Sequence, residues 1–322
     1  MNKVLCSVAT RGRYFTTLPL VLSAIINQTR PVDKLVIFDD NDEPQDMRSE
    51  MIYSYFFQML DIKGIAWEWQ YAGKKGQHHI HQRANMMGYD LVWRVDDDAV
   101  PEPNVLENLI KHFDRRVGAV GGSVLTPPYM PDTSNSTGRI DDIDKEPNIQ
   151  WGRINASRNV DHLHCTFLYR AGIADYNLGL SRVAHREETL FTHSLAQKGW
   201  QIKVVPDAIT WHMKNPEGGI RSETKEEMYH HDEQIFRNIL QHRDRTIVVL
   251  NCGLGDHLVF SHVLPAIPNA EVFTCYPEVV PGKSIAEAQH LFGDISHWNV
   301  YQKMDQWKWK DSLEKAFRKL YL

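Results

Sequence analysis

Apolar residues in the first third of this chain occur in two alternating patterns, as short continuous runs and as runs with helical spacing. The continuous runs predict buried strands, and the spacing of three and four residues predicts helices with one apolar face. Strands are expected at residues 3–9, 35–38, 65–69 and 91–93, and helices at residues 14–27, 47–60, 77–88 and 105–113. This alternation predicts an α/β fold with a doubly wound, mostly parallel sheet.

The pattern changes in the middle of the chain. Residues 117–125 predict one or two strands, but residues 126–151 are rich in Pro, Ser, Asn, Asp and Gly and have no periodicity. So long a connection is either a lid over a functional site or partly disordered, and we favour a lid. Further on, strands are expected at residues 162–169, 201–205 and 209–212, and helices at residues 187–198 and 225–243.

A charged sequence, Arg243-Asp244-Arg245, follows the last of these helices and predicts a domain boundary. Residues 1–245 then form the large α/β domain. Residues 246–322 form a small C-terminal α/β domain, which begins with an apolar strand, a glycine turn and a helix.

Composition narrows the class of protein. The chain has 322 residues, 42% hydrophobic and 24% charged, with a formal net charge of −5. These values are typical of a globular protein and give no overall basic charge for non-specific binding of nucleic acid or anionic membranes. The four cysteines form no C-x-x-C pair and are expected as reduced thiols in or near the core. No apolar run is long enough to span a membrane or to act as a signal peptide, so we expect a cytoplasmic protein.

Three consecutive aspartates, Asp96, Asp97 and Asp98, follow the fourth apolar run. Carboxylates this close repel one another, so they are stable either as a hydrated loop tip or around a divalent cation. Open α/β sheets bind ligands at the edge where their parallel strands end. The sequence therefore predicts either a site for Mg²⁺ or Mn²⁺ or an acidic turn before the next helix.

Other polar residues lie where the first two strands end. Thr10 and Arg11 follow the first strand, and Asp39 ends the second. Arg11 and Arg13 are either solvated or within reach of a phosphate. Asp39 belongs either to a ligand site or to a turn whose side chains bond their own backbone.

Two further groups lie later in the chain. Glu187 and Glu188 begin a predicted helix, where acids act either in proton transfer or by stabilising the helix dipole. His212 follows a predicted strand and is either a structural residue or a nitrogen ligand for a metal.

In their order along the chain, these residues resemble the motifs of family 2 glycosyltransferases, which have the GT-A fold. The resemblance covers residues 3–213 and rests on five motifs: Thr10-Arg11, Asn27-Gln28-Thr29, Val36-Ile37-Phe38-Asp39-Asp40, Asp96-Asp97-Asp98, and Glu187-Glu188 with the downstream Gly199-Trp200, Pro206-Asp207-Ala208 and His212. It implies a GT-A-type sheet and transfer of a sugar from a nucleoside diphosphate to a hydroxyl.

The resemblance also implies a metal site. A divalent cation that bridges the two phosphates stabilises the charge that grows on the leaving group. Asp98 is the expected direct ligand, Asp96 addresses the ribose or the metal, and Asp97 lies beside them at the nucleotide. His212 would supply a nitrogen ligand, which favours Mn²⁺ over Mg²⁺.

Donor contacts and the catalytic base follow from the same resemblance. Thr10 and Arg11 are expected at the donor, and Asp39 is expected to accept the imide N–H of uracil. An inverting transfer needs a carboxylate that takes the proton of the acceptor hydroxyl. The family usually has Glu-Asp here with the second residue as base, which corresponds to Glu188. Because this chain has the longer Glu at that position, Glu187 stays the alternative.

Three histidines, His78, His79 and His81, lie close together before the acidic strand. They suggest a metal, but no acid is spaced with them, and we interpret the run as the exposed start of a helix. Arg83 and Asn85 only roughly match an Arg-Asn pair that the family often carries near the diphosphate.

The last stretch contains Gly253-Leu254-Gly255-Asp256, which is similar to the start of heptosyltransferase-like domains, although residues 246–322 are too few for a whole one. We expect a small appendage that packs on the catalytic domain or contributes to an oligomer interface. Its tail, residues 298–321, is aromatic and basic, which leaves contact with the acceptor, a partner or a membrane surface open.

The sequence thus predicts a metal-dependent inverting glycosyltransferase, either a hexosyl- or a pentosyltransferase, with a UDP-sugar as the expected donor. A glycan or lipid-linked glycan is the expected acceptor, and the hydroxyl of a DNA base is a further candidate. One alternative is a nucleotidyltransferase, which would need a glycine-rich loop where Thr10-Arg11-Gly12-Arg13 has one glycine. The other is a non-catalytic module that binds sugar nucleotides or glycans, which would have no use for a base.

Overall fold

The computed structural model describes residues 2–214, 217–219, 225–242, 246–250, 254–263, 267, 270–274 and 299–300. The chain divides into two compact units, Met1–Glu233 and Gln234–Leu322. This division falls inside α6 (Glu226–His242), whereas the sequence places a domain boundary after residue 245. No helix within the described residues has the length and apolar character that a bilayer crossing requires.

The second unit contains a three-stranded parallel sheet and a helix among its described residues. These elements are β10 (Thr246–Leu250), α7 (Leu254–Val263), β11 (Ala270–Thr274) and β12 (Asn299–Val300). The expected strand and helix at the start of this unit are therefore present. Cys252, Gly253 and Cys275 lie outside the described residues, as does the aromatic tail apart from Asn299–Val300.

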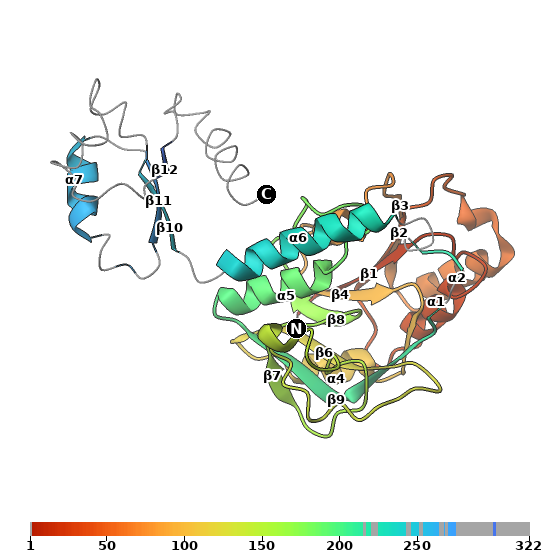
Figure 1. Ribbon diagram of the computed structural model, residues 1–322. Helices are drawn as coiled ribbons and strands as arrows, with labels where there is room; N and C mark the ends of the chain where they lie inside the picture. Colours follow the sequence, from red (N-terminus) through yellow and green to blue (C-terminus); the bar gives the residue numbers. More distant parts are fainter. Residues whose placement is uncertain are drawn as a thin grey trace. The chain divides into compact units, whose positions relative to one another are not determined.

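The first unit contains a nine-stranded mixed sheet with helices on both faces (Figure 1). Its elements before α6 are β1 (Val4–Thr10), α1 (Leu18–Ile26), β2 (Lys34–Asp39), η1 (Met47–Ser49), α2 (Met51–Ile62), β3 (Ala66–Tyr71), α3 (Gln77–Asn85), β4 (Leu91–Asp96), β5 (Ala99–Pro101), α4 (Val105–Lys111), β6 (Val117–Leu125), η2 (Ile140–Asp142), β7 (Arg158–Val160), β8 (Phe167–Arg170), α5 (Glu187–Gln197) and β9 (Gln201–His212). The strand order is β3-β2-β1-β4-β8-β6-β9-β5, with β7 beside β9. The first four strands of that order are parallel, and β8 joins them to the second half by antiparallel pairs. The predicted doubly wound α/β class is confirmed.

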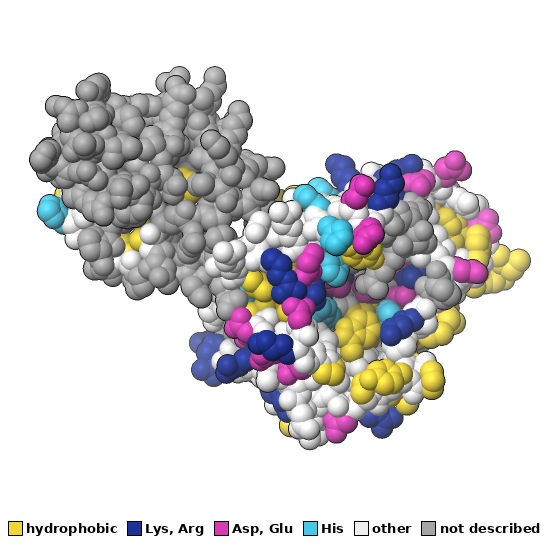
Figure 2. Space-filling view, viewed as in Figure 1, with side chains coloured by type: hydrophobic (Ala, Val, Ile, Leu, Met, Phe, Trp, Pro, Cys, Tyr) yellow, Lys and Arg dark blue, Asp and Glu magenta, His cyan; other side chains and the backbone are white. Residues whose placement is uncertain are grey.

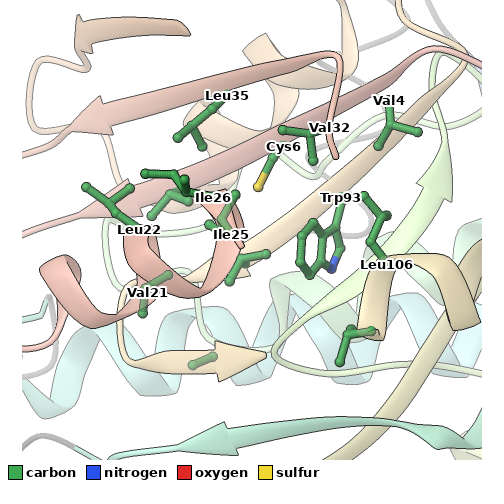
Figure 3. Close-up of a cluster of buried hydrophobic side chains, with 14 of the residues drawn as sticks. Val4, Cys6, Val21, Leu22, Ile25, Ile26, Val32, Leu35, Trp93 and Leu106 are labelled. Atoms are coloured by element: carbon green, nitrogen blue, oxygen red, sulfur yellow. The ribbon is translucent and has the colours of Figure 1, made fainter. Parts of the chain in front are cut away.

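Successive side chains of the central strands point to opposite faces of the sheet, so that a separate hydrophobic core lies on each face. Val4, Cys6 and Val8 of β1 face α1, α2 and α4 together with Trp93 of β4 (Figure 3). Leu5 of β1 faces the opposite side, where α3 and α5 pack. Complete burial of a large apolar side chain stabilises the fold by about 1.5–3 kcal/mol, so these two layers hold the strand ends in place. Cys6 and Cys165 are buried free thiols, as predicted.

Two features of the sheet differ from the sequence prediction. Residues 201–212 form one strand, because a register shift in the β6–β9 pairing accommodates Pro206 without a turn. β5 and β7 are not predicted, since three residues are too few to establish a pattern. Residues 126–151 bury Ile140, Ile149 and Gln150, and their role as a lid stays a prediction.

The expectation that the histidine run is an exposed helix start is wrong. His78 and His81 are both 0% exposed, because α3 turns this face towards the sheet along with Ile80 and Ala84. The Ser7 hydroxyl lies 3.4 Å from Nδ1 of His81. Burial lowers the pKa of His78 to about 4 and lowers the pKa of His81 as well. The imidazole rings of His78 and His81 are therefore neutral and pack between α3 and the sheet.

This burial predicts a pH dependence of stability. Between the unfolded pKa of 6.5 and the folded pKa of about 4, unfolded His78 binds a proton that the folded state excludes. The free energy of unfolding should therefore fall by up to ~3 kcal/mol as pH drops through this interval. In urea titrations His78→Gln should flatten this part of the curve, whereas His230→Gln, at an exposed position of α6, should not. An unchanged slope in His78→Gln would contradict the prediction.

Candidate active site

A cavity of about 700 Å³ opens at the carboxyl ends of β1 and β4. Figure 2 shows acidic and histidine side chains gathered near the centre of the first unit. The parallel register sets Ala9 beside Asp96, so the two strands end at the same edge. Seven of the residues predicted from the sequence line this cavity: Thr10, Arg11, Asp96, Asp97, Asp98, Glu188 and His212. The other two, Asp39 and Glu187, are buried and do not.

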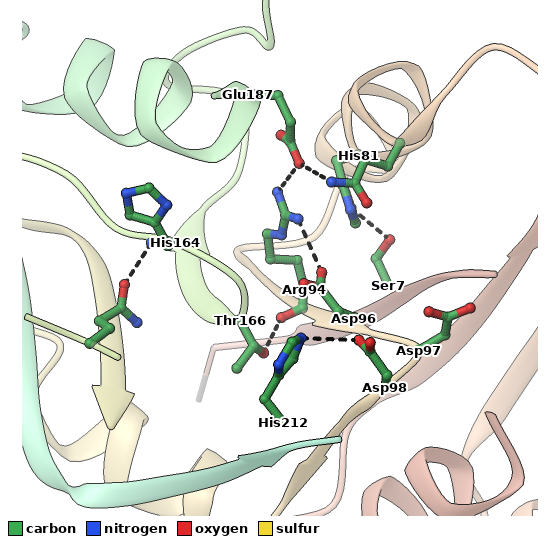
Figure 4. A network of polar contacts seen from close by, with 12 residues as sticks. Ser7, His81, Arg94, Asp96, Asp97, Asp98, His164, Thr166, Glu187 and His212 are labelled. Atoms are coloured by element: carbon green, nitrogen blue, oxygen red, sulfur yellow. Dashed lines mark hydrogen bonds and ion pairs between the residues drawn. The ribbon is translucent and has the colours of Figure 1, made fainter. Parts of the chain in front are cut away.

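Asp98 and His212 meet because β5 pairs antiparallel with the end of β9. Ala99 is the register partner of His212, and the Met213 N–H donates to the carbonyl of Asp98 at 2.8 Å. His212 Nε2 then lies 3.4 Å from Asp98 Oδ1 (Figure 4). A carboxylate oxygen and an imidazole nitrogen thus converge from two distant parts of the chain.

Arg13 provides positive charge beside the aspartates. Its Nη1 lies 2.6 Å from Asp97 Oδ1 and 2.9 Å from Asp98 Oδ2. Burial raises the pKa of Asp97 to about 6, and the guanidinium of Arg13 opposes this rise. Burial also raises the pKa of Asp96. Burial thus disfavours the charged forms of Asp96 and Asp97, and a nearby cation favours them.

The two glutamates at the start of α5 have different surroundings. Glu187 is 0% exposed, and its Oε1 lies 2.6 Å from Nη1 of Arg94. Glu188 is half-buried and lines the cavity, and among the described residues no hydrogen bond or ion pair engages its carboxylate. Of these two glutamates, Glu188 is therefore the one whose carboxylate is presented to a molecule in the cavity.

Two acids at the end of β2, Asp39 and Asp40, also differ in whether they line the cavity. Asp39 accepts the Tyr14 hydroxyl and the backbone N–H of Asn41, which fixes the turn. Asp40 lines the cavity and accepts the backbone N–H groups of Lys75 and Gly76, both at 3.1 Å.

The family model for "Glycosyl transferase family 2" matches residues 8–177, more than half of the chain. The chain belongs to glycosyltransferase family 2. No curated protein matches the sequence of this family member.

Solved structures similar to this glycosyltransferase include residues 1–349 of TarS from S. aureus. The complex with UDP-GlcNAc has 15% identity and a TM-score of 0.52, and covers 74% of this chain and 66% of that one. The complex with UDP has 13% identity and a TM-score of 0.52, and covers 75% and 68%. GalNAc-T7 with UDP, GalNAc and Mn²⁺ has 10% identity and a TM-score of 0.52, and covers 99% and 58%. The chain thus spans 58–68% of the length of these proteins, and the likeness confirms the GT-A fold.

The donor set of this glycosyltransferase fits a metal that is shared with a nucleotide. Asp98 and His212 supply one oxygen and one nitrogen donor, and Nδ1 of His212 is buried without a hydrogen-bond partner among the described residues. No group of three His, Cys, Asp or Glu side chains suited to a metal occurs in that part of the chain. A divalent cation held here would need further oxygens, such as those of a diphosphate.

Anchors of the loop before α5 were not predicted from the sequence. Asp232 of α6 is fully buried and accepts the backbone N–H groups of Ser181 at 2.6 Å and His185 at 2.8 Å. This loop carries Ala184 and Arg186 at positive φ, a strained conformation for residues with a Cβ. Asp232 lies in a charged helix whose sequence resembles any solvated surface, so only the fold reveals its role.

Arg13 leads to a prediction about metal binding. Arg13→Ala should strengthen Mn²⁺ binding in the absence of nucleotide, because Asp97 and Asp98 lose their cation, and should weaken UDP binding about tenfold. Titration calorimetry with each ligand measures both effects, with Arg13→Lys as the charge-preserving control. Weaker binding of Mn²⁺ alone would contradict the prediction.

Proposed function

We propose that the chain catalyses metal-dependent, inverting transfer of a hexose or pentose from a UDP-sugar to a hydroxyl. One observation carries the proposal: the unengaged carboxylate of Glu188 opens to the same cavity as the Asp98–His212 donor pair. A base and a site for a nucleotide–metal complex are the two parts that a single displacement requires.

Structural relatives support the choice of donor and metal. TarS was solved with UDP and with UDP-GlcNAc, and GalNAc-T7 with UDP, GalNAc and Mn²⁺. A nitrogen ligand such as His212 favours Mn²⁺ over Mg²⁺. We therefore propose Asp98 and His212 as direct ligands, with Asp96 at the ribose or the metal. When bound, the cation would stabilise the negative charge of the departing diphosphate.

The residues around this pair suggest how the nucleotide is held. We propose that Thr10, Arg11 and Asp97 contact it where β1 and β4 end. For the uracil imide we propose Asp40 in place of Asp39, because Asp40 lines the cavity and Asp39 is buried outside it.

The reaction then depends on Glu188. Its carboxylate takes the proton of the acceptor hydroxyl as that oxygen forms a bond to the anomeric carbon. The bond from the anomeric carbon to the diphosphate oxygen breaks, and the electron pair leaves with UDP. Backside attack inverts the anomeric configuration. A glycan or a lipid-linked glycan is the proposed acceptor.

A donor panel tests the proposal. UDP release from a set of UDP-sugars should require Mn²⁺ or Mg²⁺ and stop with EDTA, and NMR of the product should show inversion. Turnover unaffected by EDTA would overturn metal dependence. Tight binding of UDP without turnover on any glycan, lipid or DNA acceptor would instead favour a sugar-nucleotide-binding module, and release of pyrophosphate a nucleotidyltransferase.

A further inference from the structure

Arg94 is a buried cation in the centre of an apolar strand. Its side chain is 0% exposed, between Trp93 and Val95, which both belong to the core on one face of the sheet. Because side chains alternate along a strand, Arg94 and Asp96 share the opposite face, on which α5 packs. Arg94 therefore points towards the helix that begins with Glu187 and Glu188.

Ion pairs and hydrogen bonds connect three elements through this residue (Figure 4). Nη1 of Arg94 lies 2.6 Å from Oε1 of Glu187, and Nη2 lies 3.2 Å from Oδ1 of Asp96. Gln77 of α3 donates to Oε1 of Glu187 at 2.9 Å. We call these four residues the Arg94 network.

The Arg94 network is poorly suited to a purely stabilising role. Nε of Arg94 and Oε2 of Glu187 are buried without hydrogen-bond partners among the described residues. Burial raises the pKa of Glu187 to about 8, although Arg94 opposes the rise. Desolvation of a buried ion pair often outweighs its attraction, and apolar side chains of similar size are commonly as stable.

The Arg94 network connects the end of β4 with the start of α5, and both border the cavity. Asp96 lines the cavity at one end of the network, and Glu188, which directly follows Glu187, lines it at the other. Arg186, the N-cap residue of α5, has a left-handed backbone conformation with φ 65°, and its side chain makes no capping hydrogen bond. Within the first turn of α5, Glu187 makes the contact with β4, and Asp232 holds the preceding loop at His185.

We propose that Arg94 and Glu187 are positioning residues that fix the first turn of α5 against the end of β4 and so hold Glu188 in line with the donor. This inference rests on the proposed function, in which Glu188 is the base. It gives Glu187 a role distinct from that of its neighbour.

The test compares UDP release and UDP binding in the full chain. Arg94→Met combined with Glu187→Gln removes both charges of the buried pair, and Asp96, whose side chain is 21% exposed, loses its 3.2 Å contact with Arg94. We expect kcat to fall about 10²-fold, as for a misplaced catalytic group, while the affinity for UDP with Mn²⁺ changes much less and the stoichiometry stays the same. Arg94→Lys, which keeps the charge, should recover part of the rate. The stoichiometry of UDP binding gives the folded fraction if a variant folds poorly.

A double-mutant cycle separates this inference from the proposed function. If the network acts through Glu188, adding the two substitutions to Glu188→Gln should lower the residual rate no further. Full activity of the Arg94–Glu187 variant, a loss of kcat that only follows the loss of UDP-binding sites, or an additive loss in the cycle would each overturn the inference. Wild-type activity of Glu188→Gln would instead overturn the base assignment itself.

Discussion

Replacing Glu188 by Gln is expected to lower the rate of sugar transfer by about 10³-fold and to leave UDP binding unchanged. The amide keeps the shape of the side chain but cannot accept the proton of the acceptor hydroxyl. Because Glu188 lines the cavity without a partner among the described residues, its replacement leaves no buried charge unpaired. Steady-state UDP release and calorimetric UDP binding measure the two quantities.

Glu188→Asp is the matched control for this prediction. It keeps the carboxylate, one methylene shorter, and should retain more activity than the amide. Equal rates for the wild type and Glu188→Gln would remove the base from Glu188. Loss of UDP binding in Glu188→Gln would show that the residue acts on the donor instead.

Asp98→Asn should produce the second large effect, on binding of the donor. Asp98 has His212 at 3.4 Å and Arg13 at 2.9 Å, so the substitution removes the charge that both groups face. An amide oxygen is a much weaker ligand than a carboxylate for a hard cation. We expect the affinity for UDP in the presence of Mn²⁺ to fall about 10²-fold, or ~2.7 kcal/mol.

Calorimetry with UDP, with and without Mn²⁺, measures this change. Asp114→Asn, at an exposed acid before β6, is the control and should bind as the wild type does. UDP binding that depends on Mn²⁺ to the same degree in Asp98→Asn would exclude Asp98 as a ligand.

Local sequence patterns predicted the half of the fold that carries the proposed donor site. The apolar runs of β1, β2 and β4 are continuous, and parallel strands place Thr10, Asp39 and Asp96 at one edge whatever their exact bounds. The prediction that His212 is a metal ligand depended on the family resemblance. Its approach to Asp98 is created by β5, a strand too short to be recognised.

What the sequence could not predict are interactions between distant segments. The histidines of α3 resemble a polar surface, and only the packing of that helix shows that they are buried. Asp232 resembles the other charges of α6 until its loop contacts are known. Arg94 did carry a signal, since a single charge within an apolar strand demands a buried partner, but Glu187 becomes that partner only once the fold is known.

A crystal grown with Mn²⁺ and UDP gives the most direct test, through anomalous scattering at the manganese edge. We expect one strong peak within coordination distance of the Asp98 carboxylate and His212 Nε2, with the diphosphate of UDP on its other side. A nucleotide bound elsewhere, or a diphosphate at this edge of the sheet with no manganese between it and Asp98, would contradict the proposed metal-dependent transfer.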